Sequence, residues 1–171
     1  MSQFDLFKVS DAVFSPCRTW RYVLTRKWSE GPTLNALMLN PSTADEALND
    51  NTVERVERRA RTSGYGQLVV TNLFAFRATD PQDMLAASDP VGPENDRYIL
   101  EVAQTADMVL CAWGAHGNHL DRSSFVVSML RRVGASLHYL VLTSAGEPGH
   151  PLYLPYSLQP TPWAPEETHP Q

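Results

Sequence analysis

The sequence predicts an α/β fold with three layers, in which a four-stranded parallel sheet is flanked by helices. Short apolar runs typical of buried strands alternate along the chain with amphipathic segments typical of helices. This alternation is characteristic of parallel strands joined by crossover helices. No internal repeat or linker interrupts it. We therefore expect one domain over residues 1–154, followed by a Pro-rich tail over residues 155–171 that wraps along the surface or frays.

The N-terminal part differs from the rest because its side chains alternate with a period of two. Trp20, Tyr22 and Leu24 alternate with Arg21 and Val23, which predicts a β-hairpin or edge strands before the parallel sheet. Further along the chain, the predicted parallel strands are residues 34–39, 67–72, 107–112 and 137–142. The predicted helices are residues 52–63, 81–87, 93–105 and 122–133, the first with Asn51 and Glu54 at capping-box spacing.

Composition limits the classes of function. No run approaches the length of a membrane helix, and the N-terminus lacks the pattern of a secretory signal, so we expect a cytoplasmic protein without a membrane partner. Cys17 and Cys111 fit two reduced cysteines. The net charge of −5 argues against a dedicated high-affinity nucleic-acid binder. We interpret the arginine-rich stretch 55–61 as the solvated face of a helix, with a local basic groove as the alternative. The oligomeric state stays open.

Four unusual segments each follow the end of a predicted parallel strand. They are residues 40–43, 72–77, 113–117 and 143–153, and they are polar, Gly-rich or aromatic. The carboxyl ends of parallel strands share one edge of an open sheet, and ligands bind there. The sequence therefore predicts one site built from these segments.

Several side chains in these segments suit recognition of a planar, polar ligand. The amide of Asn72 could pair with the edge of a nucleobase, or it could cap a strand. Phe74 and Phe76 could stack on such a ligand, although at least one of them is expected in the core. The candidate substrate-binding residues are Pro41, Ser42, Thr43, Asn72, Phe74, Phe76, Arg77, Trp113, Gly114, His116 and Gly117.

Candidate catalytic groups are Asn40, Asp45 and His150. Asn40 offers a donor and an acceptor, and His150 could stabilise an anion, or it could be a surface histidine. Asp45, like Glu46 and Asp50, could orient water or merely flank a helix N-terminus.

His116 and His119 lie near Asp121, but this set is too small to predict a metal site. The glycines around His116 favour close approach of the backbone to a ligand instead. Motifs for nicotinamide or P-loop nucleotide binding and the nucleophile elbow are absent from the sequence, so we expect no cofactor.

Five strings carry a family resemblance: MLNPSTAD at 38–45, LVVTNLFAFRATDP at 68–81, DPVGPEND at 89–96, WGAHG at 113–117 and GHPLYL at 149–154. They resemble a bacterial and phage family catalogued as domain of unknown function 1643. More distantly, their order resembles the uracil-DNA glycosylase superfamily, in which a motif such as Asn-Pro-Gly follows the first core strand. Asn40-Pro41-Ser42 is similar to that motif, and His150-Pro151-Leu152 is loosely similar to the second motif, without its Ser-Pro step.

The resemblance implies a glycosylase-like fold and a nucleobase-recognising N-glycosidase. Asn72 would read the base, Phe74 or Phe76 would stack on it, Asn40 or Asp45 would orient water, and His150 would stabilise the departing base. The expected partner is a nucleobase-containing small molecule or DNA, single-stranded or modified. A non-catalytic nucleotide or nucleic-acid binding module and another hydrolase or transferase on the same fold stay open as alternatives.

Overall fold

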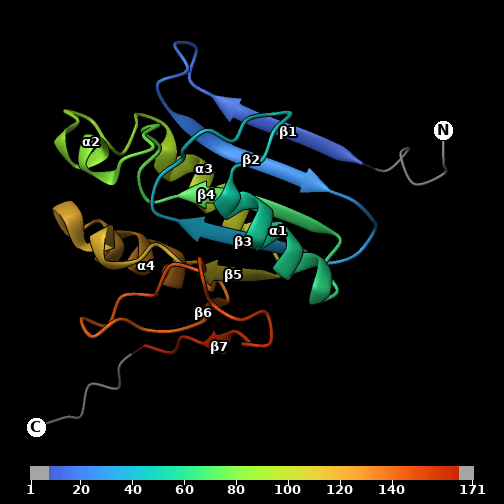
Figure 1. Ribbon diagram of the computed structural model, residues 1–171. Coiled ribbons are helices and arrows are strands. Elements are labelled where there is room, and N and C mark those ends of the chain that lie inside the picture. The colour runs from blue at the N-terminus through green and yellow to red at the C-terminus, as the bar shows by residue number, and fades with distance from the viewer. Residues whose placement is uncertain (1–7, 166–171) are drawn as a thin grey trace, which may run out of the picture.

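The apolar runs of the sequence form the centre of one β-sheet in the computed structural model, which describes residues 8–165 (Figure 1). β3 (Thr33–Met38) pairs in parallel with β4 (Gln67–Asn72) on one side and with β5 (Met108–Cys111) on the other. β6 (Leu137–Tyr139) continues the parallel pairing beyond β5. The seven strands of the sheet have the order β1-β2-β4-β3-β5-β6-β7.

The sheet is larger and more mixed than the sequence predicts. β1 (Val9–Phe14) and β2 (Arg21–Lys27) form the predicted hairpin, and β2 also pairs antiparallel with β4. At the other edge, β7 (Thr161–Pro162) pairs antiparallel with β6. The predicted four-stranded parallel sheet therefore describes only the centre, because the hairpin and the tail each extend it with antiparallel strands.

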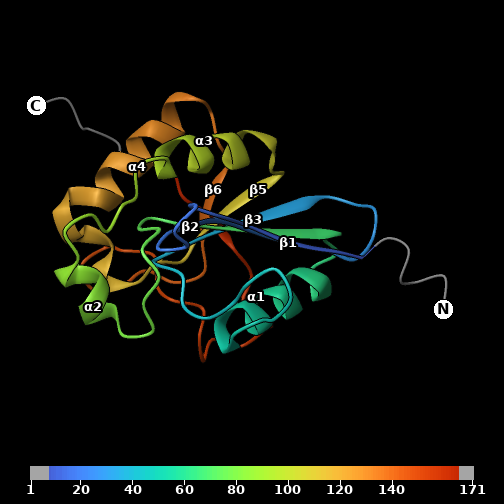
Figure 2. The ribbon, with the colours of Figure 1, turned by 90° about the horizontal axis from the view of Figure 1, so that it is seen from above.

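Helices cover both faces of the sheet, as Figure 2 shows. α1 (Asn51–Thr62) lies on one face, while α3 (Asn95–Thr105) and α4 (Arg122–Arg132) lie on the other. α2 (Pro81–Ala86) follows the loop after β4, and the short 3₁₀ segment η2 (Ala115–Asp121) precedes α4. The α/β class and the four predicted helices are confirmed.

Side chains of β3 pack alternately into two hydrophobic clusters. Leu34 and Met38 join the cluster that contains Val56 of α1, whereas Leu37 joins the cluster that contains Leu130 of α4. All five of the residues 34–38 are buried. Coverage on both faces explains why this strand is apolar almost without interruption.

The first helix begins one residue away from the predicted cap. Asp50, not Asn51, is the N-cap, and its Oδ1 accepts a hydrogen bond of 2.9 Å from the Val53 N–H. The capping carboxylate satisfies a backbone donor that the helix leaves unpaired.

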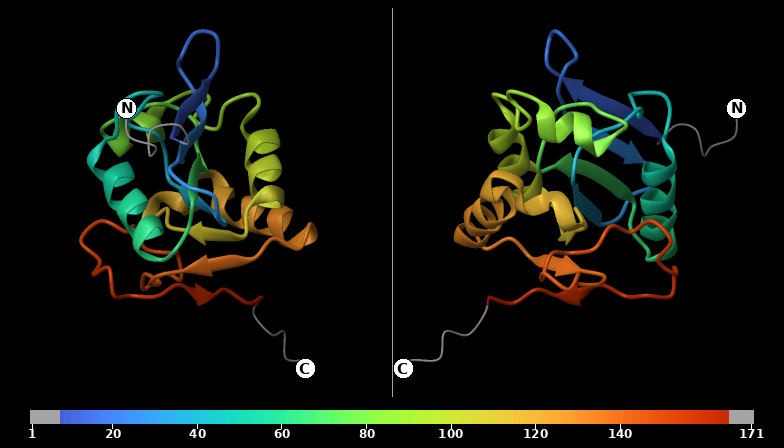
Figure 3. Two further views of the ribbon diagram at one scale, coloured as in Figure 1. Left: turned by 90° about the vertical axis from the view of Figure 1, so that its right-hand side faces the viewer. Right: turned by 60° about the vertical axis from the view of Figure 1, so that its left-hand side comes forward.

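The C-terminal segment runs along the surface between β6 and α1 (Figure 3). Arg59 of α1 is 4% exposed and donates hydrogen bonds to the carbonyl oxygens of Leu154, Pro155 and Leu158. The interpretation of residues 55–61 as a solvated face is therefore wrong for Arg59. The predicted tail wraps as far as it is described, and Pro170 lies outside the described residues.

No helix within residues 8–165 combines the length and the apolar character that crossing a membrane requires. Both cysteines are free, with Cys17 exposed and Cys111 buried. Burial raises the pKa of the Cys111 thiol.

Candidate functional site

A cavity of about 500 Å³ lies where β3 and β4 end, next to the N-terminus of α1. Its volume is within the range of small-molecule sites, and its place matches the ligand crevice of open parallel sheets. The polar residues that line it are Arg21, Asn40, Ser42, Thr43, Asp50, Asn51, Thr52, Asn72, Thr79 and His150. Three of the four predicted segments therefore meet at one site.

Asn72 is the last residue of β4, and its side chain is both buried and unpaired. The residue is 2% exposed, and its Oδ1 has no hydrogen-bond partner among the described residues. Its Nδ2 donates no hydrogen bond to those residues either. An amide left in this state costs free energy unless a ligand or water satisfies it. Asn72 thus adds a buried amide without an internal side-chain partner to the lining of the cavity.

Asn40 joins the two loops that follow β3 and β4. Its Nδ2 donates a hydrogen bond of 2.9 Å to the carbonyl oxygen of Ala78, and the Ala78 N–H donates to the carbonyl oxygen of Pro41. No donor within residues 8–165 bonds the Asn40 Oδ1. The side chain is therefore held in place while its acceptor stays available.

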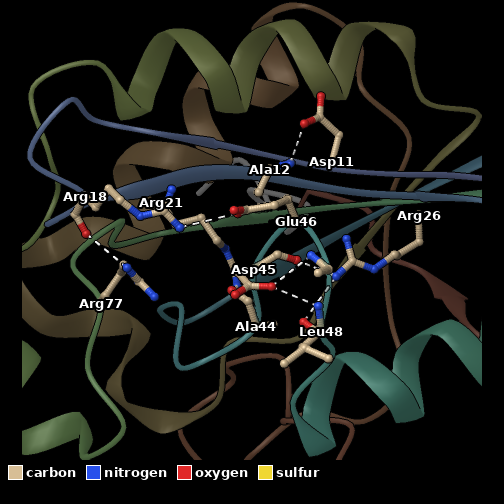
Figure 4. A network of polar contacts seen from close by, with 11 residues as sticks. Asp11, Ala12, Arg18, Arg21, Arg26, Ala44, Asp45, Glu46, Leu48 and Arg77 are labelled. Atoms are coloured by element: carbon tan, nitrogen blue, oxygen red, sulfur yellow. Dashed lines mark hydrogen bonds and ion pairs between the residues drawn. The ribbon is translucent and has the colours of Figure 1, made fainter.

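Arginines of β2 hold the loop between β3 and α1, as Figure 4 shows. Residues 40–43 and 50 of this loop line the cavity. Arg21 donates a hydrogen bond of 2.9 Å to the carbonyl oxygen of Ala44, and Arg26 donates to those of Asp45 and Leu48. Arg18 adds an ion pair of 3.3 Å with Glu46. These contacts tie the loop to the neighbouring hairpin.

Arg21 is also a buried cation at the cavity wall. It is 2% exposed, its Nε has no partner, and no carboxylate of the described residues lies within ion-pair distance. Burial lowers the pKa of Arg21 to about 10, and the charge of Asp50 partly opposes this shift. The guanidinium stays protonated at neutral pH, so the cavity carries a fixed positive charge beside the carboxylate of Asp50.

The structure brings Asp50, not Asp45, to the cavity. The Oδ1 of Asp45 accepts hydrogen bonds of 2.8 Å from the N–H groups of Ala47 and Leu48, and these bonds hold the pKa of Asp45 below its ordinary value. Asp45 therefore shapes the loop, whereas Asp50 is the carboxylate that a ligand in the cavity can meet.

His150 enters the cavity from the segment after β6. Its Nδ1 accepts a hydrogen bond of 3.2 Å from the Leu152 N–H, which places the ring proton on Nε2. Gly114 supports this segment, because its N–H donates to the carbonyl oxygen of Pro148 while its backbone has a φ of 79°. Burial lowers the pKa of His150, so the ring is a neutral donor at neutral pH.

The buried neutral state of His150 predicts a pH-dependent stability. Its pKa is below the ordinary value of 6.5, so the stability that it contributes is full above that pH and is lost as the pH falls. His150→Gln should weaken the fall in melting temperature between neutral and mildly acidic pH. The exposed His116 is the control, and His116→Gln should keep the wild-type pH profile. Identical profiles for all three proteins would contradict the assignment.

Several predicted site residues lie away from the cavity. Phe74 is fully buried in the cluster beneath α3 and α4, and Phe76 packs against the same cluster. Trp113 is buried and donates a hydrogen bond of 2.6 Å to Glu147. The other residues that do not line the cavity are Arg77, Gly114, His116 and Gly117.

Gly117 has a packing role that the sequence did not indicate. A Cβ atom at this position would lie 2.1 Å from Cδ1 of Trp113, so only glycine fits against the indole ring. His119 packs its ring against Phe74, with the centroids 5.7 Å apart. Within residues 8–165, no group of three or more histidine, cysteine, aspartate or glutamate side chains is placed to hold a metal ion.

Sequence reasoning missed Arg21 as a site residue. The alternation around Trp20 and Tyr22 predicted a strand there but gave Arg21 no role. In the structure β2 lies between β1 and β4, and Arg21 is buried. A signal was present, since an arginine near the start of a strand that is otherwise rich in aromatic and β-branched residues is a candidate for a buried, functional charge.

Comparison with known proteins gives a family but no activity. No curated protein and no solved structure matches the chain. A family described as a protein of unknown function, DUF1643, matches residues 21–152. This match covers β2 to His150, which includes every polar residue named above as lining the cavity. The chain therefore belongs to the DUF1643 family.

Proposed function

We propose that the protein is an N-glycosidase that recognises a nucleobase in the cavity at the ends of β3 and β4. The observation that carries this proposal is the amide of Asn72, which is 2% exposed and unpaired at the cavity. An amide offers one acceptor and two donors in one plane, which matches the edge of a nucleobase. The four adjacent parallel strands at the centre of the sheet support the resemblance to the uracil-DNA glycosylase superfamily.

In the proposed reaction, water attacks the sugar carbon and the bond from that carbon to the base nitrogen breaks. The electron pair of this bond moves onto the base, and the water proton passes to the Asp50 carboxylate. His150 donates its Nε2–H to the negative charge that develops on the base, and the fixed charge of Arg21 favours the same anion. Asn40 Oδ1 accepts a hydrogen bond from the attacking water.

Mass spectrometry of released base tests this proposal. The substrates are nucleotides and single- and double-stranded DNAs that carry modified bases. Asp50→Asn keeps the cap of α1, since asparagine is also a good N-cap. It removes the carboxylate that accepts the proton of the attacking water. We expect release by the wild type and by Asn118→Ala, an exposed control, with a loss of at least about 100-fold in Asp50→Asn and Asn40→Ala. Unchanged release by Asp50→Asn would overturn the assignment of the water-activating group.

A binding module without turnover is the second candidate. It is favoured by the contacts of Asp50, whose two oxygens accept hydrogen bonds from the N–H groups of Val53 and Ala44 at 2.9 and 3.4 Å. A carboxylate held in this way is suited to capping as well as to catalysis. Tight calorimetric binding of a substrate that releases no base would select this function.

A further inference from the structure

A second hollow of about 520 Å³ adjoins the cavity. It lies beside α1 and the segment after His150, and two residues, Asn51 and Leu152, line both hollows. Its remaining lining residues are Glu54, Arg55, Arg58, Tyr153 and Tyr156. We call this second hollow the α1 groove. The two hollows are therefore neighbours, with Asn51 and Leu152 between them.

The α1 groove holds positive charge that the protein does not neutralise. The guanidinium carbons of Arg55, Arg58 and Arg59 lie 5.6, 5.9 and 5.5 Å from the centre of the Tyr156 ring. None of the three forms an ion pair with a described carboxylate. Glu54 is the one acid in the lining, and its carboxylate accepts a hydrogen bond from Asn49. Converging like charges repel one another, and a bound anion would relieve this repulsion.

The three arginines differ in how many hydrogen bonds their guanidinium groups already make within the protein. Arg59 is committed to the carbonyl oxygens of the tail, as described above. Arg55 makes one side-chain hydrogen bond, of 3.3 Å, to the hydroxyl of Tyr156, and Arg58 is exposed and donates to no described residue. Two guanidinium groups are therefore available to an anion in the groove.

An exposed aromatic side chain, that of Tyr153, also lines the α1 groove. Tyr153 is 84% exposed and has a φ of 68°, in the left-handed region that residues other than glycine rarely adopt. Strained backbone of this kind concentrates at functional sites. An exposed aromatic ring beside arginines that form no ion pair is the combination with which proteins bind single-stranded nucleic acids, by base stacking and phosphate contacts.

We propose that the α1 groove binds the single-stranded nucleic acid that flanks the base held in the cavity. Arg55 and Arg58 contact its phosphodiester groups, and an unpaired neighbouring base stacks on Tyr153. The proposal rests on the proposed recognition of a nucleobase and narrows its substrate to a polynucleotide instead of a free nucleotide. The net charge of −5 argues against high affinity for nucleic acid over the whole surface, but the acidic residues lie largely outside this groove.

Fluorescence anisotropy with labelled single-stranded DNA of mixed sequence tests the groove directly. The full chain is titrated with a series from one to about ten nucleotides at several salt concentrations. Affinity should rise steeply once the strand extends beyond one nucleotide. The double variant Arg55→Gln/Arg58→Gln should lose about 10-fold or more in affinity, and its salt slope should fall by about 1.4, the value for two phosphate contacts on a single strand. Tyr153→Ala should weaken binding without changing the slope.

A matched control removes two arginines from the opposite face of the sheet. Arg97→Gln/Arg132→Gln changes the net charge by the same amount and should bind like the wild type. Equal losses of DNA affinity in both double variants would overturn the proposal by showing that charge alone matters. An affinity of the wild type for polyglutamate as high as its affinity for DNA would do the same. Affinity independent of strand length would overturn it as well.

The groove and the base site can fail separately. Asn72→Ala should keep most of the affinity for the strand, because the phosphate contacts remain, but should lose selective recognition of the base. Length-independent binding with Asn72-dependent base recognition would reject the groove and leave the proposed function in place. Length-dependent binding that requires Arg55 and Arg58, with no effect of Asn72 on recognition, would reject the base site.

Discussion

Asn72→Asp should reduce base release by at least about 100-fold, because a site that is built to hydrogen-bond a polar ligand loses much of its affinity when a donor is removed. The carboxylate keeps the size of the amide but can only accept hydrogen bonds when ionised. Asn72 is 2% exposed, so the lost donor cannot be replaced easily by bulk water. Release of base is measured by mass spectrometry and nucleoside binding by calorimetry.

The exposed Asn118 provides the matched control for this substitution. Asn118→Asp introduces the same charge at a residue outside the cavity and should keep the wild-type rate. Melting temperatures of both variants verify that they are folded. A wild-type rate in a folded Asn72→Asp protein would show that the amide does not contact the ligand.

Arg59→Ala should destabilise the protein by about 3 kcal/mol, which lowers the melting temperature by roughly 10 °C for a chain of this size. The substitution removes a buried guanidinium and leaves the carbonyl oxygens of Leu154 and Leu158 without their donor. The carbonyl oxygen of Pro155 loses one of its two donors and keeps the Leu158 N–H. Urea unfolding of the wild type and the variant measures the difference in free energy.

Arg58 is the control, because it lies in the same helix as Arg59 but is exposed. Arg58→Ala should change the free energy of unfolding by no more than about 0.5 kcal/mol. Limited proteolysis should in addition cut the segment 154–158 faster in Arg59→Ala. Equal stability of the two variants would contradict a role of Arg59 in holding the tail.

Much of the fold could be predicted because its central strands are short and apolar. β4 has the predicted bounds, since Gly66 precedes the run and polar residues end it. β6 is shorter than expected and ends at Tyr139, although Leu140 remains buried beyond its end. The antiparallel additions were harder to predict, because β7 has two residues and depends on contacts with β6 that no local pattern encodes.

For the candidate site as well, local sequence predicted some features, and others depended on tertiary packing. Asn40, Asn72 and His150 were predicted from their positions at or after strand ends, and all three line one cavity. The same rule failed for Phe74, because its ring turns into the core on the side of α3 and α4. Sequence spacing does not determine which side of the sheet a side chain faces. It also does not determine which of two nearby carboxylates reaches the cavity, because both depend on packing.

The short strand β7 has a consequence for behaviour at high protein concentration. Without β7, β6 would be the open edge of the sheet, and its unpaired backbone N–H and C=O groups could pair with a strand of another molecule. Trp163 donates its N–H to the carbonyl oxygen of Leu137, and Arg131 in turn binds the carbonyl oxygen of Trp163. Residues beyond the part of the chain that the family match covers thus shield this edge from aggregation.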